Sequence, residues 1–556
     1  MNTGSRQRIT VGELVVRFLE MQGTRAAFGV ISIHNMPILD AFHKRRKIRF
    51  VSARGEAGAC NMADAYARVS GALGACVTST GTGAGNAAGA LVEAITAGTP
   101  MLHLTGQIEA EYLDRDLGFI HEAPAQLAML QSVSKAAFRI RDAATALATL
   151  REAARIARTP PCGPVSIEIA IDVQSSMLDL PDDLALVAPA PLQADAAQID
   201  ALADKLAAAR RPMLWLGGGA RGAPDAVARL VKLGFGVVTS VQGRGIVAED
   251  DPATLGSYNL QKPVEDFYQT CDAMLVVGSR LRSNETLRYK LQLPKALYRI
   301  DANALAQNRG YASELFLQGD AAATLAALAD RLEGRMQVDA QFASDLQQAR
   351  ASAGIQVDAA LGPYIKLKNA VSRLADKRCW WVRDITLSNS MWGNRAPVLE
   401  HPRAGVHALG GGIGQGLAMA IGTSVADATH ALGRKTLALA GDGGFMLNVG
   451  ELACAVQEKA ELVVLLMNDS CYGVIKNIQD DIYGSRHCYV DLVNPDFAAL
   501  CASLKVPHLR LSDPAQAEAT LEQALQIKGG PVLVEVDMKA WGAFAAKFAG
   551  PILKKD

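Results

Sequence analysis

The chain has 556 residues, too many for one hydrophobic core, and this length predicts three or four domains of ordinary size. Lysine plus arginine and aspartate plus glutamate number 56 each, so the formal charge is zero and gives no electrostatic signal for a nucleic acid or an anionic membrane. Nine scattered cysteines without a C-x-x-C pair, a polar N-terminus and the lack of any apolar run of membrane-spanning length predict a cytoplasmic protein with reduced thiols.

The first part of the chain has a repeated strand and helix pattern, which predicts an α/β domain over residues 1–188. A helix is predicted from Thr10, a capping residue with Glu13 three positions further on. Short apolar strands are predicted at 26–30, 50–52, 75–79 and 101–105. Polar or glycine-rich turns are predicted at the carboxyl ends of strands, at 32–35 and 80–86.

Two further blocks repeat this pattern. A proline-containing break at 189–195 predicts a linker, and a second domain is predicted over 196–335. The polar, alanine-rich run 337–354 predicts a helical linker before a third domain over 360–556. The shared alternation of strands and helices predicts an α/β fold of three Rossmann-like domains with mainly parallel sheets.

The third domain contains an acidic turn between two predicted buried strands. Residues 435–440 end at Gly441-Asp442-Gly443, residues 462–467 end directly at Asn468, and a helix is predicted between them over 447–459. Ligands of open α/β sheets bind at the carboxyl ends of strands. A carboxylate, a carboxamide oxygen and a turn carbonyl suit Mg²⁺ and leave positions for phosphate oxygens. Taken alone, Gly-Asp-Gly is more often a plain turn.

A second candidate is the segment 54–68, in which Glu56 follows a predicted strand and precedes small residues and a helix. This arrangement places one carboxylate at the mouth of a close-packed junction between strand and helix. An ordinary acidic residue at a helix N-terminus, favoured by the helix dipole, is the alternative interpretation.

Together these motifs resemble those of thiamine-diphosphate-dependent enzymes of the acetolactate synthase, benzoylformate decarboxylase and benzaldehyde lyase group. The Gly-Asp-Gly run with Asn468 about two dozen residues later is similar to that family's metal signature, and 54–68 to its glutamate segment. Residues 80–86 resemble its glycine loop, with Thr82 in place of the usual proline, and 408–422 its glycine-rich segment. The matches run through the whole chain in the family's order, so the resemblance implies the thiamine-diphosphate-binding fold, with pyrimidine-binding, central and diphosphate-binding domains.

The resemblance also implies a cofactor and its contacts. Glu56 would hydrogen-bond the aminopyrimidine ring of thiamine diphosphate and promote the tautomer that removes the thiazolium proton. Mg²⁺ would be held by Asp442, Asn468 and the carbonyl oxygen of Ser470. Ile413 would separate the two cofactor rings, with ordinary core packing as the alternative. The implied cofactor-binding residues are Glu56, Asn86, Gly412, Ile413, Gly441, Asp442, Gly443, Gly444, Asn468, Tyr472, Gly473 and Val474.

Two histidines are implied near the reacting carbonyl group, where they would transfer protons. His34 aligns with an active-site histidine of benzaldehyde lyase, and His121 with a Gln or His that the group places over the thiazolium. For each, a polar loop histidine is the alternative. The expected substrate pocket contains His34, Val474, Ile475 and Ile478. Ile478 replaces the tryptophan of branched-chain acetolactate synthases, so the resemblance leaves the substrate open.

The implied function is a thiamine-diphosphate- and Mg²⁺-dependent 2-oxo acid decarboxylase or carboligase that forms an aldehyde or a 2-hydroxy ketone through an enamine on the cofactor. The alternatives are a carbon–carbon lyase acting on an acyloin, a hydroxyacyl thioester or a cyclic dione, and a non-catalytic homologue. The family implies a homodimer or homotetramer with active sites between subunits. Glycine turns in the central domain leave flavin or ADP as alternatives there, but an empty site is favoured.

Overall fold

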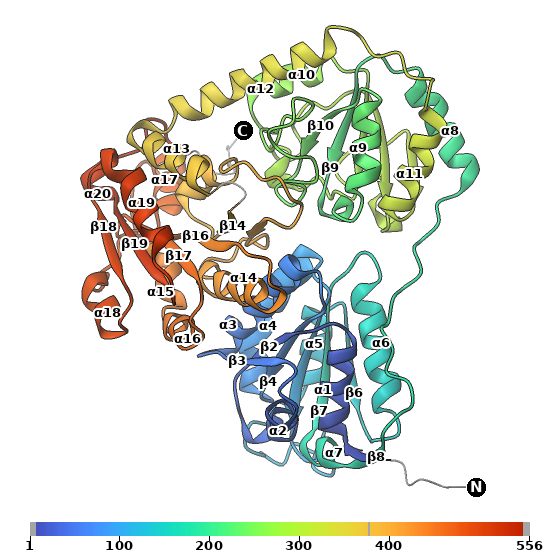
Figure 1. Ribbon diagram of the computed structural model, residues 1–556, viewed down its shortest axis with the longest axis vertical. Coiled ribbons are helices and arrows are strands. Elements are labelled where there is room, and N and C mark those ends of the chain that lie inside the picture. The colour runs from blue at the N-terminus through green and yellow to red at the C-terminus, as the bar shows by residue number, and fades with distance from the viewer. Residues whose placement is uncertain (1–6, 376–377, 549–556) are drawn as a thin grey trace.

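The computed structural model describes residues 7–375 and 378–548, and it contains three parallel sheets, each covered by helices (Figure 1). The first part of the chain lies at the bottom of Figure 1, the central part at the upper right and the last part at the left. The predicted α/β architecture with mainly parallel sheets is therefore confirmed. The domain bounds drawn from composition stay a prediction.

The first sheet has six parallel strands in the order β3-β2-β4-β5-β7-β6. Its strands are β2 Ala26–Gly29, β3 Arg49–Ser52, β4 Gly74–Thr78, β5 Met101–Gln107, β6 Ala136–Ile140 and β7 Pro164–Ala170. Its helices are α1 Val11–Met21, α2 Met36–Arg45, α3 Glu56–Ser70, α4 Thr82–Ala97, α5 Gln126–Val133, α6 Ala146–Arg158 and α7 Ile171–Ser175. A short antiparallel pair, β1 Arg8–Thr10 with β8 Met177–Asp179, lies beside them. Thr10 caps α1 by accepting the N–H of Glu13, as predicted.

The second sheet has five parallel strands in the order β10-β9-β11-β12-β13. Its strands are β9 Pro212–Leu216, β10 Gly236–Thr239, β11 Ala273–Val277, β12 Ala296–Asp301 and β13 Leu315–Gln318. The helices are α8 Ala196–Ala207, α9 Pro224–Lys232, α10 Lys262–Tyr268, α11 Ala321–Leu332 and α12 Phe342–Ala359. Helix α12 crosses the top of Figure 1 to the last part of the chain, which confirms that the linker predicted near 337–354 is helical, displaced by a few residues.

The third sheet has six parallel strands in the order β15-β14-β16-β17-β19-β18. Its strands are β14 Cys379–Arg383, β15 Gly405–His407, β16 Lys435–Gly441, β17 Leu462–Asn468, β18 His508–Leu511 and β19 Val532–Asp537. The helices are α13 Ile365–Leu374, α14 Gly416–His430, α15 Asp442–Leu447, α16 Glu451–Gln457, α17 Gly473–Ile482, α18 Phe497–Ser503, α19 Ala517–Gln526 and α20 Met538–Trp541.

The helix predicted over 447–459 forms as α16, over the shorter range Glu451–Gln457. Helix α15 starts earlier, at Asp442, and ends at Leu447, and α16 starts separately at Glu451. The break falls at Asn448, whose backbone leaves the helical region and whose side chain donates to the carbonyl of Gly414 at 2.7 Å. Apolar spacing continues across the break, and for this reason the sequence pattern did not reveal it.

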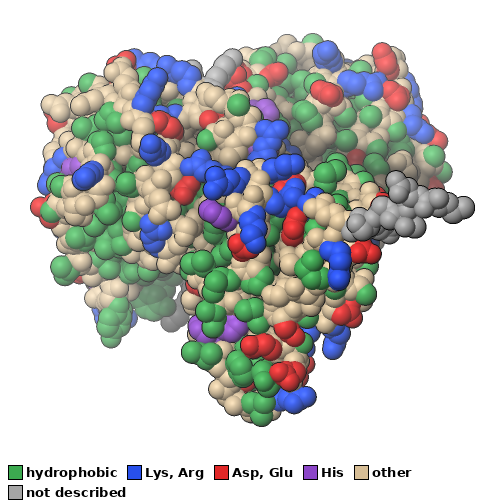
Figure 2. All heavy atoms as spheres, turned by 60° about the horizontal axis from the view of Figure 1, so that its bottom comes forward, with side chains coloured by type: hydrophobic (Ala, Val, Ile, Leu, Met, Phe, Trp, Pro, Cys, Tyr) green, Lys and Arg blue, Asp and Glu red, His purple; other side chains and the backbone are tan. Residues whose placement is uncertain are grey.

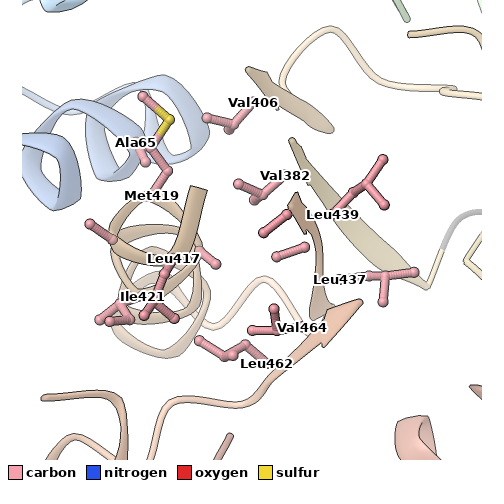
Figure 3. Close-up of a cluster of buried hydrophobic side chains, with 14 of the residues drawn as sticks. Ala65, Val382, Val406, Leu417, Met419, Ile421, Leu437, Leu439, Leu462 and Val464 are labelled. Carbon is pink, nitrogen blue, oxygen red and sulfur yellow. The ribbon is translucent and has the colours of Figure 1, made fainter. Parts of the chain in front are cut away.

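Helices α3 and α14 join the first and third parts of the chain in one buried layer. Both are almost wholly buried, and Figure 3 shows Met419 of α14 beside Ala65 of α3, with strands β14, β16 and β17 on the other side of α14. Gly422 permits this approach, because a Cβ there would lie 2.1 Å from the carbonyl oxygen of Met62. The start of α3 and the loop before α14 are thus fixed relative to each other.

The outer surface carries no single dominant charge on the face shown in Figure 2, where lysine and arginine side chains lie beside acidic and hydrophobic ones. None of the helices in the described ranges is long and apolar enough to cross a membrane.

Candidate active site

The first half of the candidate site lies at the carboxyl ends of the first sheet's strands. Glu56 is the first residue of α3, and its Oε2 accepts a hydrogen bond from Asn86 Nδ2 at 3.1 Å. Gly83 makes room for the carboxylate, because a Cβ there would lie 3.0 Å from Glu56 Oε1. The structure therefore brings together the glutamate and glycine-loop motifs that the sequence singled out.

The loop before α4 is held by a residue that sequence reasoning missed. Gln126 is buried, and its Oε1 accepts hydrogen bonds from the N–H of Gly81 at 2.6 Å and from Thr80 Oγ1 at 2.9 Å. Gly81 has a φ of 57°, a conformation that favours glycine. Gln126 lies 45 residues from Gly81, and no local pattern pairs them.

His34 and His121 meet, with ring centroids 5.3 Å apart in an edge-to-face arrangement. His34 is 2% exposed, and its Nδ1 has no hydrogen-bond partner among the described residues. Burial lowers the pKa of His34, the neighbouring His121 lowers it further, and Glu109 opposes both effects. The His34 ring is therefore neutral near pH 7, with one nitrogen left to bind a ligand or carry a proton.

The second half lies at the carboxyl ends of β16 and β17. Asn494 Nδ2 donates to Asp442 Oδ2 at 2.7 Å and to Asn468 Oδ1 at 3.1 Å, so both oxygens lie within hydrogen-bond distance of one amide group. Asn468 is oriented by its own amide, which donates to Glu535 Oε1 at 2.8 Å. Burial is the main cause that raises the pKa of Asp442 to about 7. Within 7–375 and 378–548, no group of three or more His, Cys, Asp or Glu side chains could hold a metal ion.

This oxygen pair fits a hard cation that is also bound by other oxygens. Both oxygens accept hydrogen bonds from the Asn494 amide, so they lie close enough together to share one ligand. Ser470 follows with a φ of 54°, and its carbonyl oxygen accepts the N–H of Leu492 at 2.8 Å. A carbonyl oxygen has two lone pairs, so one remains for a metal.

The segment after Ser470 closes over the acidic turn. The ring of Tyr472 packs directly against Gly443. A Cβ at position 443 would lie 2.6 Å from this ring, so glycine leaves the space that the packing needs. Helix α17 begins at Gly473 and carries the predicted pocket residues Val474 and Ile478, both half-buried, and Ile475, which is 48% exposed. Ile475 is the most open of the three to a ligand or to another chain.

The glycine-rich loop before α14 is anchored by Asp384, a buried residue that the sequence analysis did not identify. Its carboxylate accepts the N–H groups of Ile385 at 2.7 Å, Gly414 at 3.1 Å and Gly416 at 3.1 Å. Burial raises the pKa of Asp384 to about 6, against the effect of these bonds. Ile413 projects from the loop and is 38% exposed, so in the single chain it is not an ordinary core residue.

The same loop is tied to the first part of the chain by a buried ionic group. Arg68 pairs with Asp64 and Glu93, and its Nη1 donates to the carbonyl of His407 at 2.7 Å. Glu93 in turn accepts the N–H groups of Leu409 at 2.8 Å and of the following glycine at 2.5 Å. The one guanidinium is shared by both carboxylates, and backbone N–H groups also bind Glu93, so each buried charge has partners.

The two halves are not joined by direct hydrogen bonds between their proposed cofactor groups in the described part of the chain. Among the described residues, no hydrogen bond joins Glu56, His34 or His121 to Asp442 or Asn468. Hydrophobic side chains near both halves remain exposed in the single chain. They are Ile31 (63%), Ile33 (52%), Leu117 (60%), Ile120 (67%), Leu447 (56%) and Ile475 (48%).

A cavity of about 250 Å³ lies between the first and central parts of the chain. Its lining includes glycines that follow β9 and β11, three arginines (Arg280, Arg282 and Arg309) and Asp301 at the end of β12. Burial raises the pKa of Asp301. The glycine turns of the predicted central domain therefore line this cavity.

Three family models of the thiamine pyrophosphate enzymes match the chain: the N-terminal binding domain at residues 9–130, the central domain at 199–328 and the C-terminal binding domain at 388–536. The chain is 34% identical to the "Probable 2-ketoarginine decarboxylase AruI" of Pseudomonas aeruginosa, over 89% of this chain and 88% of that protein. It is 27% identical to acetolactate synthase isozyme 1 large subunit of Escherichia coli, over 97% and 95%. It is 24% identical to the mitochondrial acetolactate synthase catalytic subunit of Saccharomyces cerevisiae, over 95% and 81%. The carboxylate at the start of α3, the oxygen pair at β16 and β17, and these matches along the chain lead to one conclusion: the chain belongs to the thiamine pyrophosphate enzymes.

Proposed function

We propose that the protein is a thiamine-diphosphate- and Mg²⁺-dependent 2-oxo acid decarboxylase or carboligase, which releases an aldehyde or forms a 2-hydroxy ketone. The observation that carries this proposal is the pair of complementary half-sites. One presents Glu56, steadied by Asn86, and the other presents the convergent oxygens of Asp442 and Asn468. These groups match the two chemically different ends of one cofactor.

The diphosphate end would be held through Mg²⁺ by Asp442, Asn468 and the Ser470 carbonyl. The N–H groups at the start of α15 and the glycines at 443 and 444 allow phosphate oxygens to come close. The other end would meet Glu56, whose carboxylate accepts a hydrogen bond from a ring N–H. Thiamine diphosphate supplies an electron sink for the carbon that loses carbon dioxide.

The paired histidines support proton transfer at the substrate's carbonyl oxygen. His34 is neutral because of its burial, and His121 lies at the loop surface with their rings 5.3 Å apart. A neutral imidazole with a free nitrogen accepts a proton, and its charged form returns it. Val474 and Ile475 would place an apolar wall against the substrate.

The exposed hydrophobic residues beside both halves support assembly as a homodimer or homotetramer, in which Glu56 of one chain completes the metal half of another. Clusters of exposed hydrophobic side chains mark surfaces that a partner chain covers in the assembled protein. Mixing Glu56→Gln and Asp442→Ala chains tests this, because a mixed dimer contains one site free of both changes. Random mixing should restore about a quarter of the wild-type activity. No recovery after proven exchange of subunits would refute assembly across chains.

The reaction is tested with a panel of 2-oxo acids in the presence of thiamine diphosphate and Mg²⁺, with carbon dioxide and ligated products measured together. The panel includes pyruvate, an aromatic 2-oxo acid and a guanidino 2-oxo acid, the last because the 34% identical relative carries the name of a 2-ketoarginine decarboxylase. Glu56→Gln is the control and should lose turnover while it retains cofactor binding. Cleavage of benzoin without decarboxylation of any 2-oxo acid would favour the carbon–carbon lyase instead.

We predict that the cavity between the first and central parts of the chain holds no flavin. Absorption at flavin wavelengths in the purified protein would overturn it.

A further inference from the structure

Glu451 is a buried carboxylate that none of the proposed steps uses. It is the first residue of α16, in the third part of the chain, and is 2% exposed. Its oxygens accept the backbone N–H of Arg54 at 3.1 Å and the backbone N–H of Gly55 at 3.0 Å. The hydrogen-bond donors lie about 400 positions earlier in the sequence, immediately before Glu56.

Helix α3 has no cap of its own at this end. Its N-cap residue is Gly55, and no side chain near in sequence accepts a hydrogen bond there. The first N–H groups of a helix need outside acceptors, and an anion at this end is also favoured by the helix dipole. Glu451, from a different part of the fold, places an anion at this end and accepts the N–H groups of Gly55, the N-cap residue, and of Arg54 before it.

The glutamate motif itself is shaped around Glu451. A Cβ on Gly58 would lie 2.2 Å from Glu451 Oε1 and 2.7 Å from its carboxyl carbon. Glycine at position 58 thus leaves the space in which this carboxylate sits. The side chain is fixed from two directions, by the N–H groups on one side and by the backbone of the first turn of α3 on the other.

We infer that Glu451 is a positioning residue that holds the first turn of α3 and thereby orients Glu56 toward the cofactor. The inference rests on the proposed function, because it assigns Glu56 its role. Glu451 touches neither substrate nor cofactor in this assignment. It acts through the hydrogen bonds to Arg54 and Gly55, so its loss should affect turnover more than binding at the diphosphate end, where Asp442 and Asn468 act.

The test is Glu451→Gln, which keeps the size of the side chain but removes its negative charge and replaces Oε2, 3.1 Å from the backbone nitrogen of Arg54, by an N–H₂ donor. Glu458→Gln is the matched control. Glu458 also reaches from α16's C-terminal end to the first part of the chain, where it pairs with Arg49 at 2.7 Å, and among the described residues it makes no hydrogen bond or ion pair with α3's first turn. A third variant, Glu451→Asp, keeps the negative charge. Its kcat and its exchange rate should lie between those of the wild type and of Glu451→Gln.

Two measurements are made on each variant. Hydrogen–deuterium exchange of the peptide containing Arg54 and Gly55 needs no substrate, and exchange in Glu451→Gln should be about tenfold faster than in the wild type. The kcat should fall about tenfold or more, while KM and the Kd of thiamine diphosphate change by less than about threefold. The Glu458→Gln variant should differ little from the wild type in both.

The outcomes separate this inference from the proposed function. If no 2-oxo acid is turned over by the wild type, the proposed function fails, and the exchange experiment still reports whether Glu451 holds the helix. Unchanged exchange at Arg54 and Gly55 in Glu451→Gln would overturn the inference. Equal losses in Glu451→Gln and Glu458→Gln would also overturn it, because they would indicate general packing between the two parts of the chain.

Discussion

The contact between α3 and α14 predicts a large effect for the smallest substitution at Gly422. In Gly422→Ala the new Cβ would lie 2.1 Å from the carbonyl oxygen of Met62 and 2.7 Å from that residue's carbonyl carbon and Cα. These are backbone atoms of a buried helix and cannot rotate away. Overpacking of a close-packed core costs about 1–3 kcal/mol, whereas alanine gains about 1 kcal/mol over glycine in a helix interior. The clash is severe, so we expect a net loss of about 1–2 kcal/mol.

The effect should extend to the site, because α3 starts at Glu56 and α14 follows the glycine loop that carries Ile413. The assay is the urea midpoint by circular dichroism together with thiamine diphosphate affinity. Gly89→Ala is the matched control, since Gly89 lies in helix α4 with no atom within 4 Å of its added Cβ. This control should be neutral or stabilised by up to about 1 kcal/mol. A Gly422→Ala protein as stable as the control, with unchanged affinity, would refute the reasoning.

Two further predictions concern the metal half and a buried histidine. Asp442→Ala removes one of two convergent oxygens, so the Kd of thiamine diphosphate at fixed Mg²⁺ should rise at least about 100-fold by calorimetry, and an unchanged Kd would remove Asp442 from the site. His103 is fully buried, hydrogen-bonded to Thr78 and Ser166, and burial lowers its pKa to about 4. Because the pKa of His103 is lower in the folded protein than in the unfolded chain, its contribution to the free energy of unfolding is complete above pH 6.5 and is lost as the pH falls toward 4. His103 should therefore account for a loss of about 2 kcal/mol in the free energy of unfolding between pH 7 and pH 5. Urea midpoints at both pH values should show this loss in the wild type, and an equal loss in His103→Gln would contradict the assignment.

Several features of the site could be predicted because they are encoded locally. The Gly-Asp-Gly turn, the strand that ends at Asn468 and the glutamate segment each lie within a short stretch whose apolar spacing and glycines indicate their backbone. Parallel strands end at one sheet edge, so residues after them were expected to converge. The meeting of His34 with His121 is consistent with this expectation.

Other features depended on packing between distant segments. Gln126, Asp384 and Asn494 each hold a predicted motif in place, and none of them lies in a recognisable pattern. The separation of α15 from α16 at Asn448 was also not predicted, and the Asn448 side chain there binds a loop 34 residues away.

The sequence by itself determined the family and the parallel α/β layers, and it supplied the polar groups that we propose for the two ends of the cofactor site, because these follow from local periodicity and short motifs. The tertiary structure decided how those groups are held. Glu451 holds the two residues before the helix of Glu56 across about 400 residues, and Asn494 bridges Asp442 and Asn468 from a loop that carries no motif. Such partners are chosen by which buried N–H groups and oxygens remain unsatisfied once the sheets have packed, and that choice is made only in three dimensions.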